Sequence, residues 1–250
     1  MDTVGQQQDV MRDATADFSL GQLTQRQLRR LRRAGGLAFA MGYGFAMATT
    51  TGAMWNPGQG KHVVLVQRFC RALCQAMGVQ LMLHGPVPRQ QALWVANHIS
   101  WLDVAVIGAK ARVFFLAKAE IARWPVMGAL ARAGGTLFIQ RGSGDAGSVA
   151  QQVADFLRQG MPVLFFPEAT TTDGRTVRKV HGKLLAAALQ TRTPIQPVVL
   201  CYVNQQGGLD LRVPFVDDIT MAEHLSEMLV HDPVTAHVQA LERIDPTGHD

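Results

Sequence analysis

A histidine and an aspartate in the segment VANHISWLD, residues 95–103, could act together in acid–base chemistry. His98 precedes Asp103 by five residues, and an apolar run lies directly before the pair. An aspartate that accepts a hydrogen bond from one imidazole nitrogen fixes the tautomer and leaves the other nitrogen available as a general base. The chain has eight histidines, so this spacing also arises by chance. The alternative is a capping histidine beside a solvated aspartate.

Two further charged residues end or follow apolar runs. Arg141 is the last residue of GTLFIQR, residues 135–141, and Glu168 comes directly after MPVLFFP, residues 161–167. In α/β folds, ligands bind outside the carboxyl ends of the strands, so these side chains would gather with the His–Asp pair at one edge of a sheet. Either residue alone fits an ordinary surface position equally well. The combination of three such strand ends favours a functional site.

The elements that must position these residues alternate between short apolar runs and helical patterns from about residue 85 onward. The expected strands cover residues 92–97, 111–118, 135–141, 161–168, 194–203 and 234–241. The expected helices begin near residue 101 or cover residues 123–134, 145–160, 183–190 and 221–230. This alternation predicts an α/β domain with a mixed, largely parallel sheet flanked by helices.

The N-terminal part of the chain has a different composition. Five arginines in residues 26–33 are followed by an uncharged stretch, residues 34–54, of about membrane-spanning length. Small residues recur at every fourth position of that stretch from Gly36 to Gly52, which would let a second helix approach closely. Residues 62–83 read as an amphipathic helix. Together these segments predict a membrane-associated helical hairpin that dips into one leaflet, although a single span is also consistent with the length of the first segment.

We therefore expect a basic N-terminal segment at 1–33, the hairpin at 34–84 and a catalytic domain at 85–250. Arginines before the apolar stretch favour a cytoplasmic N-terminus, so the site would face the cytoplasm at the inner (cytoplasmic) membrane. A signal peptide is the alternative interpretation of a basic cluster before an apolar run. The cluster lies far from Met1 and the run is long, and both features disfavour that alternative.

Overall composition narrows the class of protein. Apolar residues make up 48% of the chain and charged residues 17%, which excludes a disordered protein. The three cysteines form neither a CxxC motif nor an even-numbered framework, so we expect free thiols in a reducing compartment.

Four ordered segments resemble the motifs of glycerolipid acyltransferases of the 1-acylglycerol-3-phosphate acyltransferase type. The segments are NHISWLD, GTLFIQR, FPEATTTDG and IQPVVL, and their order and spacing along residues 85–215 also fit. The resemblance implies transfer of a fatty acyl group from acyl-CoA or acyl carrier protein to 1-acyl-glycerol-3-phosphate, giving phosphatidic acid. It also implies an embedded N-terminal hairpin and a bilayer as partner, with no metal, cofactor or nucleic acid.

The resemblance also implies roles for individual residues. His98 would deprotonate the acceptor hydroxyl while Asp103 orients it, and the activated thioester requires no serine nucleophile. The implied substrate-binding residues lie in or beside the motifs: Asn97, Arg141, Glu168, Thr170, Lys179 and Pro197. Within this set Arg141 and Glu168 would bind the acceptor head group, and Pro197 would shape the acyl or donor site.

The third motif departs from the family pattern, which continues Glu-Gly-Thr-Arg. Here Glu168 is followed by Ala169, Thr170 and Thr171. Threonine cannot replace an arginine as a bidentate phosphate partner, so another lysolipid, such as lyso-ornithine lipid, is the alternative acceptor. A thioesterase or lipid hydrolase would use the same pocket with water, but its serine form lacks a G-x-S-x-G elbow here. A non-enzymatic lipid-binding protein is disfavoured because the catalytic residue types are all present.

Overall fold

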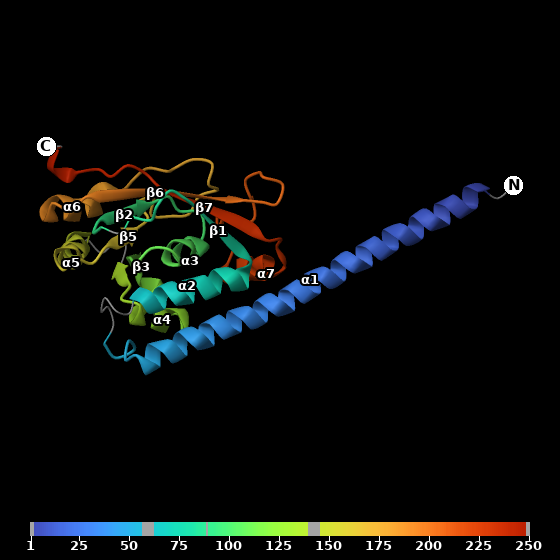
Figure 1. The fold of residues 1–250 in the computed structure, drawn as a ribbon, viewed down its shortest axis with the longest axis horizontal. Helices are drawn as coiled ribbons and strands as arrows, with labels where there is room; N and C mark the ends of the chain where they lie inside the picture. Colours follow the sequence, from blue (N-terminus) through green and yellow to red (C-terminus); the bar gives the residue numbers. More distant parts are fainter. Residues whose placement is uncertain (1–2, 57–62, 89, 140–145, 249–250) are drawn as a thin grey trace.

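The structure is a computed structural model that describes residues 3–56, 63–88, 90–139 and 146–248. Its described strands form a seven-stranded sheet in the order β1-β7-β6-β2-β5-β3-β4 (Figure 1). The strands are β1 (Val79–His84), β2 (Leu93–Ala96), β3 (Phe114–Lys118), β4 (Leu137–Ile139), β5 (Val163–Phe165), β6 (Ile195–Val203) and β7 (Val234–Ala240). Only the β6–β7 pair among them is antiparallel. The predicted α/β class with a largely parallel sheet is confirmed.

Helices cover the sheet on two faces because successive strand residues point to opposite sides. Trp94 and Leu164 face the core that contains α2 and α3, whereas Leu93 and Phe165 face the core that contains α5 and α6. The covering helices are α2 (Val63–Met77), α3 (Leu102–Gly108), α5 (Ala146–Arg158), α6 (Ala186–Thr191) and α7 (Met221–Val230). Both cores are filled by apolar side chains, as the predicted strand runs require.

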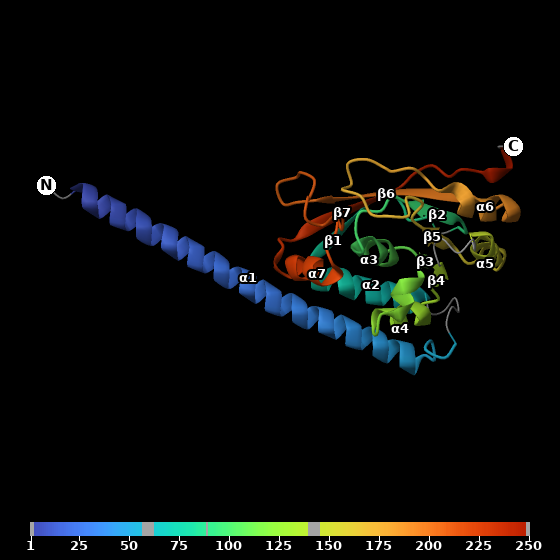
Figure 2. The same ribbon diagram turned by 180° about the vertical axis from the view of Figure 1, so that it is seen from behind.

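The N-terminal helices form the predicted pair. Helix α1 (Thr3–Thr50) runs alongside α2 in the opposite direction, and its first turns project beyond the rest of the molecule (Figures 1 and 2). A Cβ added at Gly36 would lie 3.2 Å from the Cβ of Ala76, and one at Gly44 would lie 2.7 Å from the Phe69 ring. The stripe of small residues therefore does admit a second helix. Gly52 lies beyond the end of α1.

Membrane association of this hairpin stays a prediction. Within residues 3–56, 63–88, 90–139 and 146–248, a helix that combines membrane-crossing length with sufficient apolarity is absent.

The helices and strands of the structure depart from the expected bounds at three places. Residues 62–83 are not one helix, because α2 ends at Met77 and Gly78 adopts a left-handed φ of 72° before β1 begins. Strand β1 pairs with β7, so the sheet begins before residue 85. Helix α1 continues through the expected boundary between residues 33 and 34. Val79 and Leu81 alternate with the polar residue between them at the period of a strand. This alternation is the sequence signal for β1, which the expected helix over residues 62–83 passed over.

Short 3-10 segments account for a further difference. The helix expected over residues 123–134 is α4 (Met127–Ala133), which begins later than expected, and a 3-10 turn, η2 (Ala119–Arg123), precedes it. The helix expected over 183–190 begins as a 3-10 turn, η3 (Gly182–Leu185), and continues as α6. A last 3-10 turn, η4 (Pro246–Gly248), lies near the C-terminus.

Arginines of the basic cluster join α1 to the end of α7. The Arg33 guanidinium is buried and donates to the Met228 carbonyl at 2.6 Å, and Arg29 donates to the Val230 carbonyl at 3.1 Å. Burial, followed by the nearby charge of Arg29, lowers the pKa of Arg33 to about 10. The last carbonyls of a helix lack partners within it, and these side chains supply them. Helix α1 is thereby fixed to the sheet domain.

Candidate active site

The His–Asp pair lies at the carboxyl end of β2. His98 is in the loop before α3, and its Nδ1 is 2.8 Å from Oδ2 of Asp103, the second residue of that helix. The side chain of His98 is 20% exposed, whereas that of Asp103 is 0% exposed. Donation from Nδ1–H to the carboxylate leaves Nε2 as the nitrogen that can face a substrate. The contact expected from the spacing is present.

Further donors hold the buried carboxylate of Asp103. Oδ2 accepts the backbone N–H groups of Ile99 at 2.7 Å and Ser100 at 3.0 Å, and Oδ1 accepts the Tyr202 hydroxyl at 2.7 Å. Burial, with the adjacent charge of Asp103, raises the pKa of Tyr202 well above its usual value, so the phenol remains a neutral donor. A fully hydrogen-bonded carboxylate is a fixed support for the imidazole.

The segment after β5 holds His98 from the other side. The Phe166 ring stacks on the imidazole with centroids 3.9 Å apart and planes 10° from parallel. The buried Glu168 accepts the His98 backbone N–H on Oε1 at 2.8 Å and the Arg178 backbone N–H on Oε2 at 2.7 Å. Thr172 donates its backbone N–H to the His98 carbonyl at 2.8 Å. The segment after β5 therefore positions the loop that carries His98.

Two residues expected to bind substrate are built into the sheet region. The Asn97 side chain exchanges hydrogen bonds of 2.9 Å with both the backbone N–H and the carbonyl of Leu200 in β6. It joins the end of β2 to its neighbouring strand in this way. Pro197 is half-buried in β6 and lies in register with Val95 of β2. Both residues are near the site, but the polar atoms of Asn97 already have backbone partners.

The remaining expected contacts are on the surface or are not described. Thr170 and Lys179 are exposed in the segment that follows β5. Arg141 lies outside the described residues. The cluster that the structure brings together therefore contains His98, Asp103 and Glu168.

Ser100 is unsuited to act as a hydrolase nucleophile. Its side chain is buried, and its Oγ is 3.4 Å from the backbone N–H of Leu102 at the start of α3. A nucleophilic hydroxyl must reach the substrate and a base at the same time. The serine-hydrolase alternative therefore has no nucleophile at this position.

Helix α7 and the chain before it support the loop that carries His98 through residues that the sequence did not single out. Trp101 donates its Nε1–H to Nδ1 of the buried His224 at 3.0 Å, and His224 Nε2 is 3.1 Å from the Arg212 carbonyl. These partners require the neutral imidazole with the proton on Nε2, and burial lowers the pKa of His224 accordingly. Phe215 donates its backbone N–H to the Ile99 carbonyl at 2.9 Å. The loop is thus braced from two sides.

Known proteins are similar to this chain in sequence. Residues 80–201 match the family model described as Acyltransferase. A lyso-ornithine lipid O-acyltransferase of Pseudomonas aeruginosa is 42% identical over 186 residues, covering 74% of this chain and 72% of that protein. A 1-acyl-sn-glycerol-3-phosphate acyltransferase of Neisseria meningitidis serogroup B is 33% identical over 150 residues, covering 59% of each chain.

A solved structure shares the fold. The crystal structure of the 1-acyl-sn-glycerophosphate (LPA) acyltransferase PlsC from Thermotoga maritima is similar with a TM-score of 0.64 and 18% identity. The match covers 90% of this chain and 89% of that chain. It includes the mixed, mostly parallel sheet with flanking helices.

Proposed function

The chain belongs to the acyltransferase family and is an O-acyltransferase, and on this premise we propose that it acylates the hydroxyl of a lysolipid, with lyso-ornithine lipid as the acceptor. The observation that carries the chemistry is the His98–Asp103 contact of 2.8 Å, with Asp103 buried and His98 reachable. This arrangement supplies a base for a hydroxyl and needs no covalent acyl-enzyme, since a thioester is already activated.

In the proposed reaction, His98 Nε2 accepts the proton of the acceptor hydroxyl as its oxygen attacks the thioester carbonyl. Asp103 accepts from Nδ1–H and stabilises the imidazolium that forms. Collapse of the tetrahedral intermediate breaks the C–S bond, and the departing thiolate takes the proton from Nε2. The stacked Phe166 ring packs on the imidazole and keeps it in place during these steps. The products are an ester and a free thiol.

Two observations support lyso-ornithine lipid as the acceptor. The P. aeruginosa relative with that name is 42% identical, against 33% for the N. meningitidis enzyme. Thr171 occupies the position where the resembling family has an arginine, and its hydroxyl donates to the Phe215 carbonyl. Binding of a phosphomonoester requires cations that contact it bidentately, such as arginine. The single carboxylate of an ornithine head group carries less charge and requires fewer such contacts. 1-Acyl-glycerol-3-phosphate is the second candidate, supported by the Neisseria relative.

Acceptor contacts are part of the same proposal. Arg141, Thr170 and Lys179 are the proposed head-group residues, since they lie beside the motifs and the latter two are exposed. Glu168 acts chiefly through the backbone of His98, and Pro197 shapes the donor side.

We also propose that the α1–α2 hairpin rests on the inner membrane with the site on the cytoplasmic side. Exposed apolar side chains on α1 and just after it, including Leu31, Phe39 and Trp55, support this placement. Partition of the unmodified enzyme and a Phe39→Ser/Trp55→Ser variant onto anionic vesicles tests it. Equal partition of the two proteins would argue against the hairpin as the contact.

Acyl transfer by the purified enzyme tests the activity. Labelled acyl-CoA and acyl carrier protein would be supplied with lyso-ornithine lipid, 1-acyl-glycerol-3-phosphate or lysophosphatidylcholine, with His98→Ala as the control. Product with lyso-ornithine lipid alone supports the proposal. Product with 1-acyl-glycerol-3-phosphate alone overturns the acceptor but keeps the chemistry. Free fatty acid without lipid product would assign the chain to the hydrolases.

A further inference from the structure

A cationic segment follows the third motif. Residues 173–183, here called the basic segment, hold Arg175, Arg178, Lys179 and Lys183 against one carboxylate, Asp173. All four cations are exposed. Exposed valines lie between them, since Val177 is 61% exposed and Val180 49%. The segment therefore presents both positive charge and apolar side chains to the solvent, as the surface that a protein partner binds does.

The backbone of the basic segment is fixed beside the catalytic histidine. Arg178 donates its N–H to Glu168 at 2.7 Å, and Glu168 in turn accepts the N–H of His98. His181 donates its backbone N–H to the Pro167 carbonyl at 2.9 Å. Gly174 has a left-handed φ of 78° and packs on Ile99, where an added Cβ would lie 2.9 Å from Cδ1. The backbone of the segment is therefore held next to the loop that carries His98.

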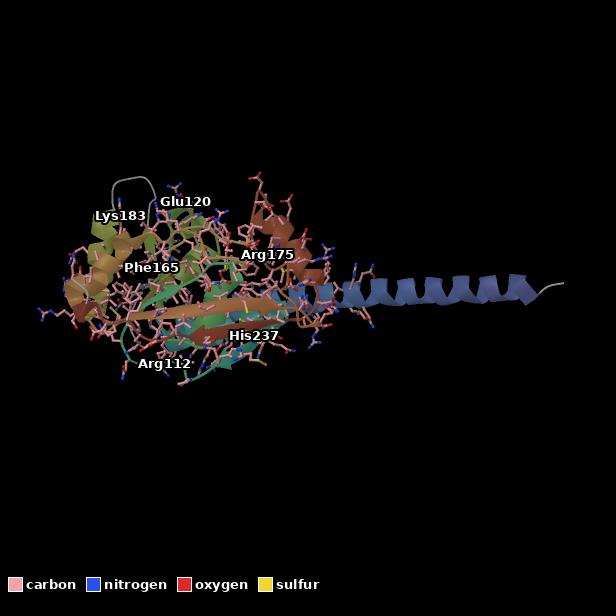
Figure 3. All side chains as sticks on the ribbon, turned by 90° about the horizontal axis from the view of Figure 1, so that it is seen from above. Arg112, Glu120, Phe165, Arg175, Lys183 and His237 are labelled. Carbon is pink, nitrogen blue, oxygen red and sulfur yellow. The ribbon has the colours of Figure 1, made fainter. Side chains whose placement is uncertain are left out.

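The basic segment and α1 lie on opposite sides of the sheet. In Figures 1 and 2 the chain between β5 and α6 crosses the top of the molecule, whereas α1 crosses the bottom. Figure 3, seen from that upper side, shows Lys183 at the upper left of the sheet domain, Arg175 to the right of its centre and Arg112 at its lower edge. A bilayer contacted by α1 would leave the basic segment facing the aqueous phase.

We propose that Arg175, Arg178 and Lys183 of the basic segment form the docking surface for an acidic carrier protein that delivers the acyl group as a thioester, while Lys179 serves the acceptor head group. The surface is exposed and combines charge with apolar contacts, which is how protein partners are recognised and steered. A nucleotide thioester would require an enclosing pocket. The proposal rests on the proposed acyl transfer from a thioester, and it deepens that function by naming the donor's partner surface.

Donor-dependent kinetics test the docking surface. Arg175→Glu and Lys183→Glu, singly and together, would be compared with Arg112→Glu, an exposed arginine elsewhere that gives the same change of charge. We expect the double variant to raise KM for acyl carrier protein about tenfold, with kcat retained and a weaker dependence on salt. KM for acyl-CoA of the same chain length should stay near that of the unmodified enzyme, and Arg112→Glu should change neither value.

Several results would overturn the docking surface. Equal losses with both donors would assign the segment to the reaction site in general. Unchanged KM for acyl carrier protein, or use of acyl-CoA alone by the unmodified enzyme, would exclude a carrier-protein surface. A loss seen only with acceptor in anionic vesicles would point to a lipid surface. Titration of the unmodified enzyme with acyl carrier protein measures docking without turnover, so inactivity with both donors would contradict the proposed function without deciding the docking question.

Discussion

Two histidine–aspartate pairs in this molecule have the same contact distance and different surroundings. His98 Nδ1 lies 2.8 Å from Asp103, and His231 Nε2 lies 2.8 Å from Asp210. Both aspartates also accept two backbone N–H groups from their own loops. The side chains of the second pair are 11% and 4% exposed, against 20% for His98.

The difference lies in which nitrogen remains. At the first pair the aspartate takes Nδ1, so Nε2, at the far end of the ring, can meet a hydroxyl at the carboxyl end of β2. At the second pair the aspartate is hydrogen-bonded to Nε2. His231 thereby joins the end of α7 to the loop before Arg212. A short His–Asp contact is therefore not evidence of catalysis by itself. What distinguishes a general base from a structural histidine is which ring nitrogen remains free and whether a substrate can reach that nitrogen.

Removing each imidazole should give the largest difference between the two pairs. His98→Ala is expected to lower the rate of acyl transfer by about 10³-fold or more, because a positioned general base contributes up to about 10⁴-fold. His231→Ala should leave the folded enzyme active and lower its stability instead. Initial rates and urea unfolding of both variants measure the two effects. Comparable loss of activity in both variants, at equal folded fractions, would remove the distinction.

Changing the two aspartates should have the next largest effects. Asp103→Asn is expected to reduce kcat by about 10³-fold, since the amide no longer supports the imidazolium. Asp210→Asn should lower the free energy of unfolding by about 1–3 kcal/mol, because it weakens buried hydrogen bonds. Single-turnover rates and denaturant melts measure these outcomes. An Asp103→Asn enzyme with unchanged kcat would contradict the assigned support role.

The phenol that contacts only one of the two pairs gives a smaller test. Tyr202→Phe removes one donor from Asp103 and leaves the three others in place. We expect about a tenfold loss in kcat with little change in KM, and a stability loss of about 1 kcal/mol. Steady-state kinetics beside Tyr43→Phe, a tyrosine on α1, separates the local effect from a general one. A change confined to KM would show that Tyr202 serves binding.

A third histidine, His224, affects how the free energy of unfolding depends on pH. Burial lowers the pKa of His224 below its ordinary value of 6.5. Between the lowered folded pKa and about 6.5, the unfolded chain binds more protons, so this residue's stability contribution is present above that window and is lost as pH falls through it. His224→Gln should therefore flatten the fall of unfolding free energy between about pH 7 and 5. Parallel curves for the two proteins would show that His224 does not titrate on unfolding.

The smallest expected effect concerns the backbone beside Glu168. Ala169 has a left-handed φ of 60°, where an L side chain is strained and the resembling family has glycine. Ala169→Gly should raise the free energy of unfolding by about 1 kcal/mol while leaving kcat nearly unchanged. Thermal and urea unfolding measure the gain. Destabilisation by glycine would mean that chain entropy outweighs the strain.

Local patterns predicted much of the fold and the centre of the site. The alternation of apolar runs and helical stretches identified the strands of the sheet, because each run packs against one of two cores. The contact between His98 and Asp103 followed from one loop and one helix start. Gly78 was missed as a boundary, since a helix and a short strand are both compatible with the apolar residues around it.

The supports of the site were not predictable, because their partners are remote in sequence. Tyr202 is 99 residues from Asp103, His224 is 123 residues from Trp101, and Glu168 is 70 residues from His98. Such contacts depend on strand order and register, which periodicity does not report. Family resemblance placed Glu168 at a head group, whereas both of its oxygens accept backbone N–H groups. A buried polar residue on an inward strand face was the available signal for Tyr202.

The arginines that cap α7 have a consequence for engineering the chain. Arg29 and Arg33 lie within the stretch that composition marks as a separate basic N-terminal segment, yet they complete the end of the helix that carries His224. A truncated enzyme that begins at residue 34 would lose both caps, and one that begins at 85 would also lose the edge strand β1. Soluble variants should therefore be sought by replacing exposed apolar side chains on α1, with the helix kept whole. Fusion partners belong before the basic cluster.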